Sequence, residues 1–268
     1  GELKEIEQGL NEPQPKVSST QGYGRVDKAA AWLLLARLYM NAEVYTGTAD
    51  WADAKTYAKK VIDSPYKLYT AKKGQWSAYQ QLFMGDNGEN GSSVEAIFPI
   101  LQDGKKTTSW GTTLFLMAGC NDNKERVKSA TEKGNNTTEG WAGNRMRPDL
   151  VQKFFPNNDA PNISAYAMPA AADDDRALFD GDGRNVTNGD DENGVKVFTN
   201  GFSVCKFNNF KTDGSAGHDS KFPDADFFLM RAAEAYLMYA EADARQNGGT
   251  TTADGAKYIN EQIGRAHV

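Results

Sequence analysis

The sequence has very little of the two side chains that most often hold metals or build disulfide scaffolds. Its 268 residues include two cysteines and two histidines, too few for the usual zinc sites. Cys120 and Cys205 lie far apart and outside any CxxC spacing. We therefore expect two buried thiols, with a single disulfide between them as the alternative. No metal site and no cofactor is predicted.

Long apolar runs and a surplus of positive charge are also missing. No stretch approaches the roughly eighteen uninterrupted apolar residues that a membrane helix needs. The net charge of −6 argues against a nucleic-acid partner, because contacts to phosphates need a basic surface. With 39% hydrophobic and 25% charged residues, the composition is that of a folded globular chain with a sizeable core.

The motifs of several enzyme classes are absent as well. The sequence has no GxSxG turn, no HExxH and no P-loop. The segment from Asp180 to Arg184 begins like an EF-hand loop, but Arg184 occupies the third ligand position and Asp191 the twelfth. We interpret it as solvated turns, with an irregular calcium site as the alternative. A glycoside hydrolase needs only two carboxylates, so that enzyme class remains as an alternative function.

Helical patterning begins near the start of the chain. Residues 27–41 place small and apolar side chains at helical spacing behind Asp27, whose carboxylate can cap the first turn. A second amphipathic stretch covers residues 51–63 and is preceded by Asp50. Because only residues 43–49 separate them, we expect an antiparallel helical hairpin.

A second pair of helices is predicted near the end of the chain. Residues 228–245 form the longest helical pattern, Asn247-Gly248-Gly249 ends it, and residues 252–265 follow as its partner. Within the first of these helices, Arg231–Glu234 and Glu241–Arg245 have the spacing of helical ion pairs. The two hairpins resemble tetratricopeptide units, but far more than the 34-residue period of a continuous array separates them.

The middle of the chain has a different character. Gly, Asn, Asp, Thr and Ser dominate residues 85–222, with helical periodicity only around 147–155 and strand-like runs at 94–98 and 195–198. A long irregular stretch inside a compact protein is usually functional. We predict a mainly α fold of tetratricopeptide-like helical hairpins with a long loop-rich insertion carrying a few short strands. Its regions are 1–84, 85–222 and 223–268, the last packing back on the first.

Four ordered blocks of residues resemble the SusD/RagB family. They are GYGRVDKAAA followed by LLARLYMNA at 22–42, GWAGNRMRPDLV at 140–151, DR at 175–176, and FFLMRAAEAYLMYAEA at 227–242. Two positions depart from the family pattern, Phe228 in place of a proline and Ile263 in place of a basic residue. The resemblance covers nearly the whole chain and implies an internal part of a longer family member.

The resemblance implies a function without catalysis. Proteins of this family are lipoproteins on the extracellular face of a Gram-negative outer membrane, held by a lipid anchor that this part of the chain would not include. Their helical hairpins pack against a SusC-like TonB-dependent transporter. The loop-rich remainder captures an oligosaccharide or other nutrient and hands it to that transporter. The alternative from the residues alone is a helical-repeat scaffold that binds only protein.

Two tryptophans are the leading ligand-binding candidates. Trp110 and Trp141 lie beside glycines in the loop-rich region, and a flat indole face suits the C–H surface of a sugar. Packing in the core is the alternative for each. Polar side chains close in the sequence, which could bind hydroxyl groups, are Asn121, Asp122, Asn144, Arg145 and Arg147.

Overall fold

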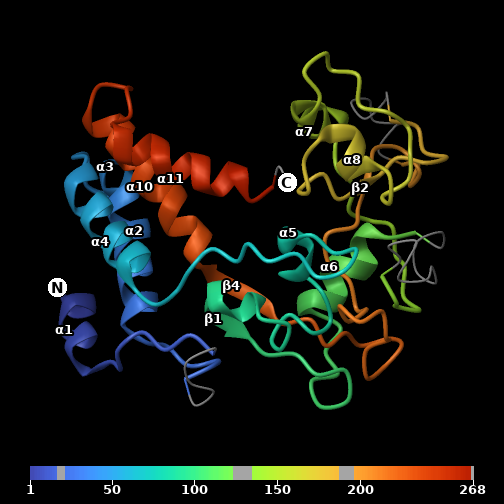
Figure 1. The fold of residues 1–268 in the computed structure, drawn as a ribbon, viewed down its shortest axis with the longest axis horizontal. Coiled ribbons are helices and arrows are strands. Elements are labelled where there is room, and N and C mark those ends of the chain that lie inside the picture. Colours follow the sequence, from blue (N-terminus) through green and yellow to red (C-terminus); the bar gives the residue numbers. More distant parts are fainter. Residues whose placement is uncertain (17–21, 123–134, 187–195, 267–268) are drawn as a thin grey trace.

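The computed structural model describes residues 1–16, 22–122, 135–186 and 196–266. It divides into a helical part and a loop-rich part, with a two-stranded antiparallel sheet between them (Figure 1). The helical part holds α1 (Glu2–Gly9), α2 (Lys28–Met40), α3 (Ala42–Thr46), α4 (Trp51–Asp63), α10 (Ala232–Gln246) and α11 (Ala253–Gly264). The sheet pairs β1 (Ala96–Ile100) with β4 (Phe227–Arg231). The predicted mainly α architecture is confirmed.

The loop-rich part contains only short elements. They are α5 (Ala78–Gln81), η1 (Ser92–Glu95), α6 (Thr112–Cys120), α7 (Pro148–Val151), η3 (Gln152–Phe154), α8 (Met168–Ala172), β2 (Phe179–Asp180) and β3 (Ser203–Val204). No helix among the described residues is both long and apolar enough to cross a bilayer.

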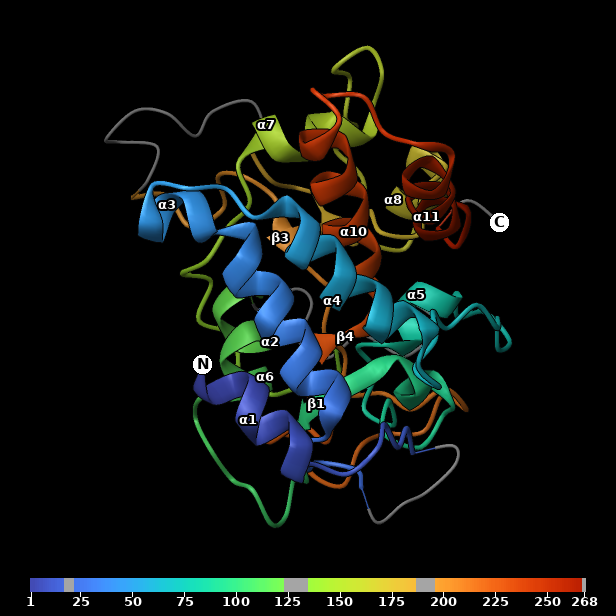
Figure 2. The same ribbon diagram turned by 90° about the vertical axis from the view of Figure 1, so that its left-hand side faces the viewer.

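The first predicted hairpin forms as expected. The Asp27 carboxylate accepts hydrogen bonds from the amides of Ala29 and Ala30 at 2.9 and 3.2 Å, which caps α2. Asp50 caps α4 through the amide of Asp53 at 3.2 Å. Helices α2, α4 and α10 then lie side by side (Figure 2). Small residues on the facing sides, including alanines with no exposed surface, allow this close approach.

The second hairpin starts later than predicted. Residues 227–231 form β4, and α10 begins only at Ala232. A short apolar run fits a strand or a buried helix equally well, and here pairing with β1 decides. The predicted Arg231–Glu234 pair is therefore wrong. Arg231 instead binds Glu95 at 3.0 Å, and Glu234 binds Arg37 of α2 at 2.6 Å. The 252–265 helix is confirmed as α11.

The helical core is rich in tyrosine. Tyr39 of α2 stacks on Tyr57 of α4 with 5.7 Å between ring centroids. The ring of Tyr258 on α11 meets Tyr236 and Tyr239 of α10 edge-on at 5.4 and 4.9 Å. Such pairs add about 0.5–1.5 kcal/mol each beyond the burial of their area. Each pair joins the two helices of one hairpin, α2 with α4 and α10 with α11.

A buried carboxylate joins this frame to the loop-rich part. Glu95, which has no exposed surface, accepts hydrogen bonds from the backbone amide of Tyr69 at 3.0 Å and from the guanidinium groups of Arg231 and Arg265. These residues come from the segment after α4, from β4 and from the end of α11. Two cations and one amide satisfy a carboxylate that would be costly to bury alone.

The loop-rich part has its own small core, with Phe202, Met168 and Val151 fully buried. The helix predicted at 147–155 is confirmed as α7 and η3. The strand predicted at 94–98 forms two residues later as β1, because residues 94 and 95 end η1. The strand predicted at 195–198 is wrong: residues 196–198 form turns, and residue 195 lies outside the described residues. Helices α6 and α8 were not predicted. The α6 sequence is apolar almost throughout and so shows no amphipathic period.

The EF-hand-like segment forms the predicted turn, with Asp182 and Gly183 exposed, but the side chains at its two ends are buried. Asp180 and Arg184 are 0 and 5% exposed. The Asp180 carboxylate accepts from the amides of Ala165 and Asp182 at 3.0 and 3.1 Å. The Arg184 guanidinium donates to the carbonyl of Gly201 at 2.8 Å. The buried side chains of Asp180 and Arg184 therefore bind neighbouring backbone and hold this turn in place. Its predicted twelfth position, residue 191, lies outside the described residues.

The two cysteines are not joined in a disulfide. Both are half-buried, and burial raises the pKa of the Cys120 thiol. A thiol with a raised pKa is a poor nucleophile at neutral pH.

Candidate functional site

Three large aromatic side chains meet on the surface of the loop-rich part. The ring centroids of Trp110 and Trp141 lie 6.3 Å apart, and those of Phe115 and Trp141 lie 6.1 Å apart, with interplanar angles of 31° and 58°. Trp110, Phe115 and Trp141 are 54, 49 and 37% exposed. We call these three residues the aromatic platform. A cluster of large exposed rings is unusual on a soluble surface and typically marks an interaction site.

Helix α6 holds two of the three rings in place. Phe115 projects from the helix itself, while the Trp141 amide donates to the carbonyl of Ala118 near its end at 2.7 Å. The amide of Asn144 donates to Gly119 at 2.6 Å. A Cβ at Gly119 would lie 2.8 Å from the Asn144 side chain. A larger residue at 119 would therefore displace the Asn144 side chain from its place beside α6.

A single carboxylate links the two indoles. The Trp141 ring N–H donates to Glu139 Oε2 at 3.1 Å. The other oxygen of Glu139 lies 3.5 Å from Lys221 Nζ, and this ammonium lies 5.1 Å from the centroid of the Trp110 ring. The ring of Phe222 meets Trp110 edge-on at 5.5 Å. The platform is thus held in one arrangement before any ligand arrives.

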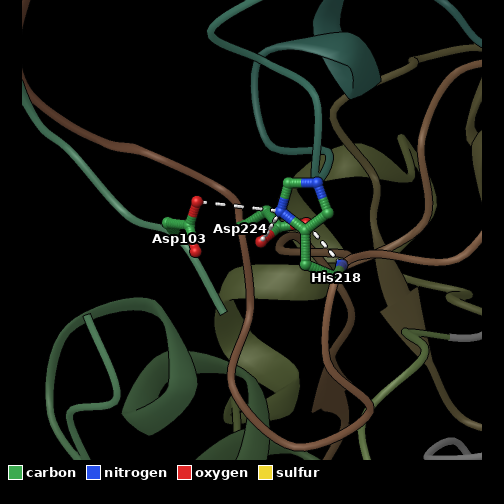
Figure 3. Close-up of side chains that lie close together, drawn as sticks. All are labelled: Asp103, His218 and Asp224. Atoms are coloured by element: carbon green, nitrogen blue, oxygen red, sulfur yellow. Dashed lines mark hydrogen bonds and ion pairs between the residues drawn. The ribbon is translucent and has the colours of Figure 1, made fainter. Parts of the chain in front are cut away.

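The loop that carries Lys221 and Phe222 is anchored by a cluster of three side chains (Figure 3). His218 Nδ1 lies 3.2 Å from Asp224 and 3.8 Å from Asp103. The Asp224 carboxylate also accepts the amides of Gly104 and His218, both at 2.7 Å. Three ligand-type atoms this close together resemble a metal site in spacing. In this structure the contacts fasten residues 218–224 to the loop before α6.

Backbone amides stabilise the charged form of Asp103 in this cluster. The amide of Lys105, followed by that of Lys106, donates to Asp103 and holds the pKa of its carboxyl below the ordinary value. On the other side of the 218–224 loop, the Thr137 hydroxyl donates to the carbonyl of Lys221 at 3.1 Å. The amide of Thr138 donates to Ser220 at 2.8 Å. Segments before α6, after α6 and at 218–224 therefore meet in one polar network.

The two predicted arginines have described contacts with residues outside the platform. Arg145 donates to the carbonyls of Val197 and Asn200, and its guanidinium lies 5.6 Å from the ring of Phe198. Arg147 forms an exposed ion pair with Asp149 at 3.0 Å. Both arginines thus hold structure within the loop-rich part. Their closeness to Trp141 in sequence does not bring them to its ring.

The other three predicted polar residues, Asn144, Asp122 and Asn121, differ in exposure and in their partners. Asn144 is exposed beside α6, three residues after Trp141. Asp122 pairs with the buried guanidinium of Arg184 at 2.8 Å. Asn121 is 1% exposed, and its side-chain amide has no hydrogen-bond partner among the described residues. Of these three residues, Asn144 is the one that is exposed beside the helix that carries Phe115.

Four residues of the site were not predicted from the sequence: Phe115, Glu139, Lys221 and Phe222. Phe115 lies in an apolar stretch, and nothing in that stretch shows that this ring faces outward. Glu139 could have been found from the sequence, because it stands only two residues before Trp141. Lys221 and Phe222 are about 80 residues further on, and only the tertiary structure brings them to Trp110.

Comparisons with known proteins agree with this architecture. Residues 180–266 match the model of the SusD family. The starch-binding protein SusD of Bacteroides thetaiotaomicron is 41% identical over an alignment 297 positions long, which covers 99% of this chain and 49% of that protein. The chain belongs to the SusD family. It spans about half the length of the SusD protein that it matches.

Solved structures with the SusD fold cover the whole chain. A SusD superfamily protein of Parabacteroides distasonis superposes with a TM-score of 0.61 at 19% identity, covering 98% of this chain and 48% of that one. Surface glycan-binding protein A of Bacteroides thetaiotaomicron, in complex with laminarihexaose, superposes with a TM-score of 0.54 at 20% identity. The superposition covers 99% of this chain and 52% of that one. The tetratricopeptide-like helical frame is thus the SusD fold.

Proposed function

We propose that this SusD-family chain captures a glycan on its aromatic platform. The observation that carries the proposal is the exposed, prearranged group of Trp110, Phe115 and Trp141. Two relatives support the ligand class, because one is named a starch-binding protein and the other forms a complex with laminarihexaose. Asn144, Glu139 and Lys221 supply polar groups at the rim.

The platform has enough surface for a weak, useful affinity. A sugar ring stacked on one aromatic face contributes about 1–2 kcal/mol. A millimolar complex needs about 4 kcal/mol, which two or three stacked rings and a few hydrogen bonds reach. A polysaccharide that engages several copies of the protein at a surface gains further by multivalency.

Affinity electrophoresis through gels containing single polysaccharides tests this proposal. We expect retardation on at least one neutral glycan and a loss of about tenfold in affinity for Trp141→Ala, the equivalent of about 1.4 kcal/mol. Trp51→Ala is the matched control, because this indole lies on α4 in contact with Arg245. Equal retardation of wild type and Trp141→Ala would exclude the platform as the binding surface. A pure protein scaffold would bind none of the glycans.

We also propose that capture occurs without turnover. The carboxylate at the platform, Glu139, already accepts the Trp141 N–H and pairs with Lys221, so it is poorly placed to protonate a glycosidic oxygen. A glycoside hydrolase would need two carboxylates flanking the scissile bond. Release of reducing sugar from any bound polysaccharide would contradict this part of the proposal.

The cellular role proposed is delivery of the glycan to a SusC-like TonB-dependent transporter on the extracellular face of the outer membrane. Family membership and the tetratricopeptide-like frame support it. The test is made on the natural full-length protein in cells. We expect it to be degraded by protease added to intact cells and to co-purify with such a transporter from detergent-solubilised membranes. Protection from added protease would contradict the location.

A further inference from the structure

A cavity of about 650 Å³ lies between α5, η3 and the β2–β3 pair. This volume falls within the range of small-molecule sites. The side chains that define its character are Tyr79, Lys153, Phe154, Arg176, Phe179 and Lys206. None of them belongs to the aromatic platform, so the cavity is a separate feature of the loop-rich part.

The cavity is positively charged although the chain as a whole is negative. Lys153, Arg176 and Lys206 face one carboxylate, Asp174, whereas the net charge of the protein is −6. Asp174 is already bound by Arg176, with Nη2–Oδ2 and Nε–Oδ1 distances of 2.6 and 2.9 Å. Neither lysine has a carboxylate partner within the described part of the chain. Two ammonium groups therefore remain available to an anion.

Aromatic rings hold two of these cations, Lys206 and Arg176, at the walls. Lys206 Nζ lies 4.3 Å from the centroid of the Phe83 ring and 5.6 Å from that of Tyr79. The guanidinium of Arg176 lies 6.0 Å from the ring of Phe154. Contacts of this kind orient a cation without neutralising its charge. An anionic ligand would meet charges that are already in place.

The same rings provide apolar surface for the body of a ligand. Phe154 and Phe179 meet edge-on with centroids 5.6 Å apart and underlie the cavity. A site that combines apolar walls with a few charged groups selects a ligand with both features. A free inorganic anion would leave the rings unused, and a neutral sugar would leave both ammonium groups unused.

We propose that this cavity binds a carboxylate-bearing saccharide, a uronic acid unit in which the ring stacks on the aromatic wall and the carboxylate pairs with Lys153 and Lys206. Charge-assisted hydrogen bonds of this type are stronger than neutral ones. The site does not depend on the aromatic platform, so it adds a second ligand class to the function proposed above.

Calorimetric titration of the chain with digalacturonate and with its uncharged methyl ester tests the proposal. We expect the acid to bind at least tenfold more tightly than the ester. The affinity for the acid should fall as salt is added. The double variant Lys153→Gln/Lys206→Gln should bind acid no better than ester. Lys257→Gln, an exposed lysine on α11, is the matched control and should leave the affinity unchanged.

The variants also separate this site from the platform. Trp141→Ala should keep full affinity for digalacturonate while losing retardation on neutral glycans, and Lys206→Arg should retain acid binding. Equal binding of acid and ester by the wild type would overturn the proposal, and so would loss of acid binding in Trp141→Ala. The wild-type comparison remains decisive even where circular dichroism shows that the double variant is unfolded.

Discussion

The helical frame and the loop-built platform are ordered by different forces. In the frame, α2, α4 and α10 bury alanines and aliphatic side chains completely, and hydrophobic burial at roughly 25 cal/mol per Å² dominates. Around the platform, side chains hydrogen-bond to the backbone: the Asp224 carboxylate accepts an amide N–H, and the Thr137 hydroxyl donates to a carbonyl. The comparison teaches that the stability and the binding surface of this protein can be perturbed separately. Substitutions in each of the two parts test that separation.

The largest effect is expected in the frame. Leu33 on α2 has no exposed surface, so Leu33→Ala removes buried contacts and leaves a cavity. We expect a loss of about 2–5 kcal/mol in the free energy of unfolding, measured by urea denaturation. Leu38→Ala is the matched control, because this leucine on the same helix is 41% exposed. Similar losses for both variants would contradict the assigned core.

Asp243 provides a test of the frame that depends on pH. Its carboxylate has no exposed surface and binds Lys55 Nζ at 2.7 Å and the amide of Thr252 at 2.6 Å. Burial alone would raise the pKa of Asp243, but the hydrogen bonds from Lys55 and Thr252 hold it well below the ordinary value. Asp243→Asn should cost about 1–3 kcal/mol of unfolding free energy at pH 7.

The sign of the pH effect follows from the lowered pKa. The folded state binds the proton on Asp243 more weakly than the unfolded state, where the pKa is about 3.9. The stabilisation is therefore present above that value and is lost as the pH falls below it. The difference between wild type and Asp243→Asn should shrink in urea denaturation at pH 3. A constant difference would contradict this, and Asp254→Asn on the exposed side of α11 is the control.

A smaller loss of stability, with a clear loss of binding, is expected for the loop anchor. Asp224→Ala removes the acceptor for the amides of Gly104 and His218 and should cost about 1–2 kcal/mol of unfolding free energy. Since the 218–224 loop carries Lys221 to Trp110, retardation on the glycan should also fall. Asp213→Ala, in an exposed turn, serves as control. Unchanged retardation for Asp224→Ala would disprove the coupling.

The smallest effect is expected for Glu139→Gln. The amide oxygen of glutamine can still accept the Trp141 N–H, but the ion pair with Lys221 is lost. Partly exposed ion pairs contribute about 0.2–1 kcal/mol, so glycan affinity should fall less than about fivefold with no change in melting temperature. The glycan affinity of Glu139→Ala should fall further, and this variant should also change the tryptophan fluorescence of the ligand-free protein. Identical behaviour of both variants would argue against a positioning role.

Local signals predicted much of the frame. The caps Asp27 and Asp50 and the helices that follow them were predicted within a residue or two, because a cap and a 3.6-residue period depend only on near neighbours. The run FFLMR at 227–231 was misassigned because its strand conformation depends on β1, about 130 residues earlier. Helix α6 was missed because an apolar helix shows no polar face.

In the candidate site too, the sequence predicted what depends on neighbouring residues and missed what depends on distant contacts. Trp110 and Trp141 stand out from their loop context, and the structure places them side by side. Asn121 looks equally suitable in sequence but is buried, and Arg145 turns to a different loop. Exposure and direction depend on how the loops pack, which composition does not encode.

The amino-acid sequence by itself determined the helical hairpins, the family and the two indoles, because periodicity, capping and motif order are written into neighbouring residues. Only the tertiary structure decided that Phe115, Glu139 and Lys221 join these indoles, and that a cationic cavity forms elsewhere. The physical reason is that such contacts join segments tens of residues apart, and their geometry exists only once both cores have packed.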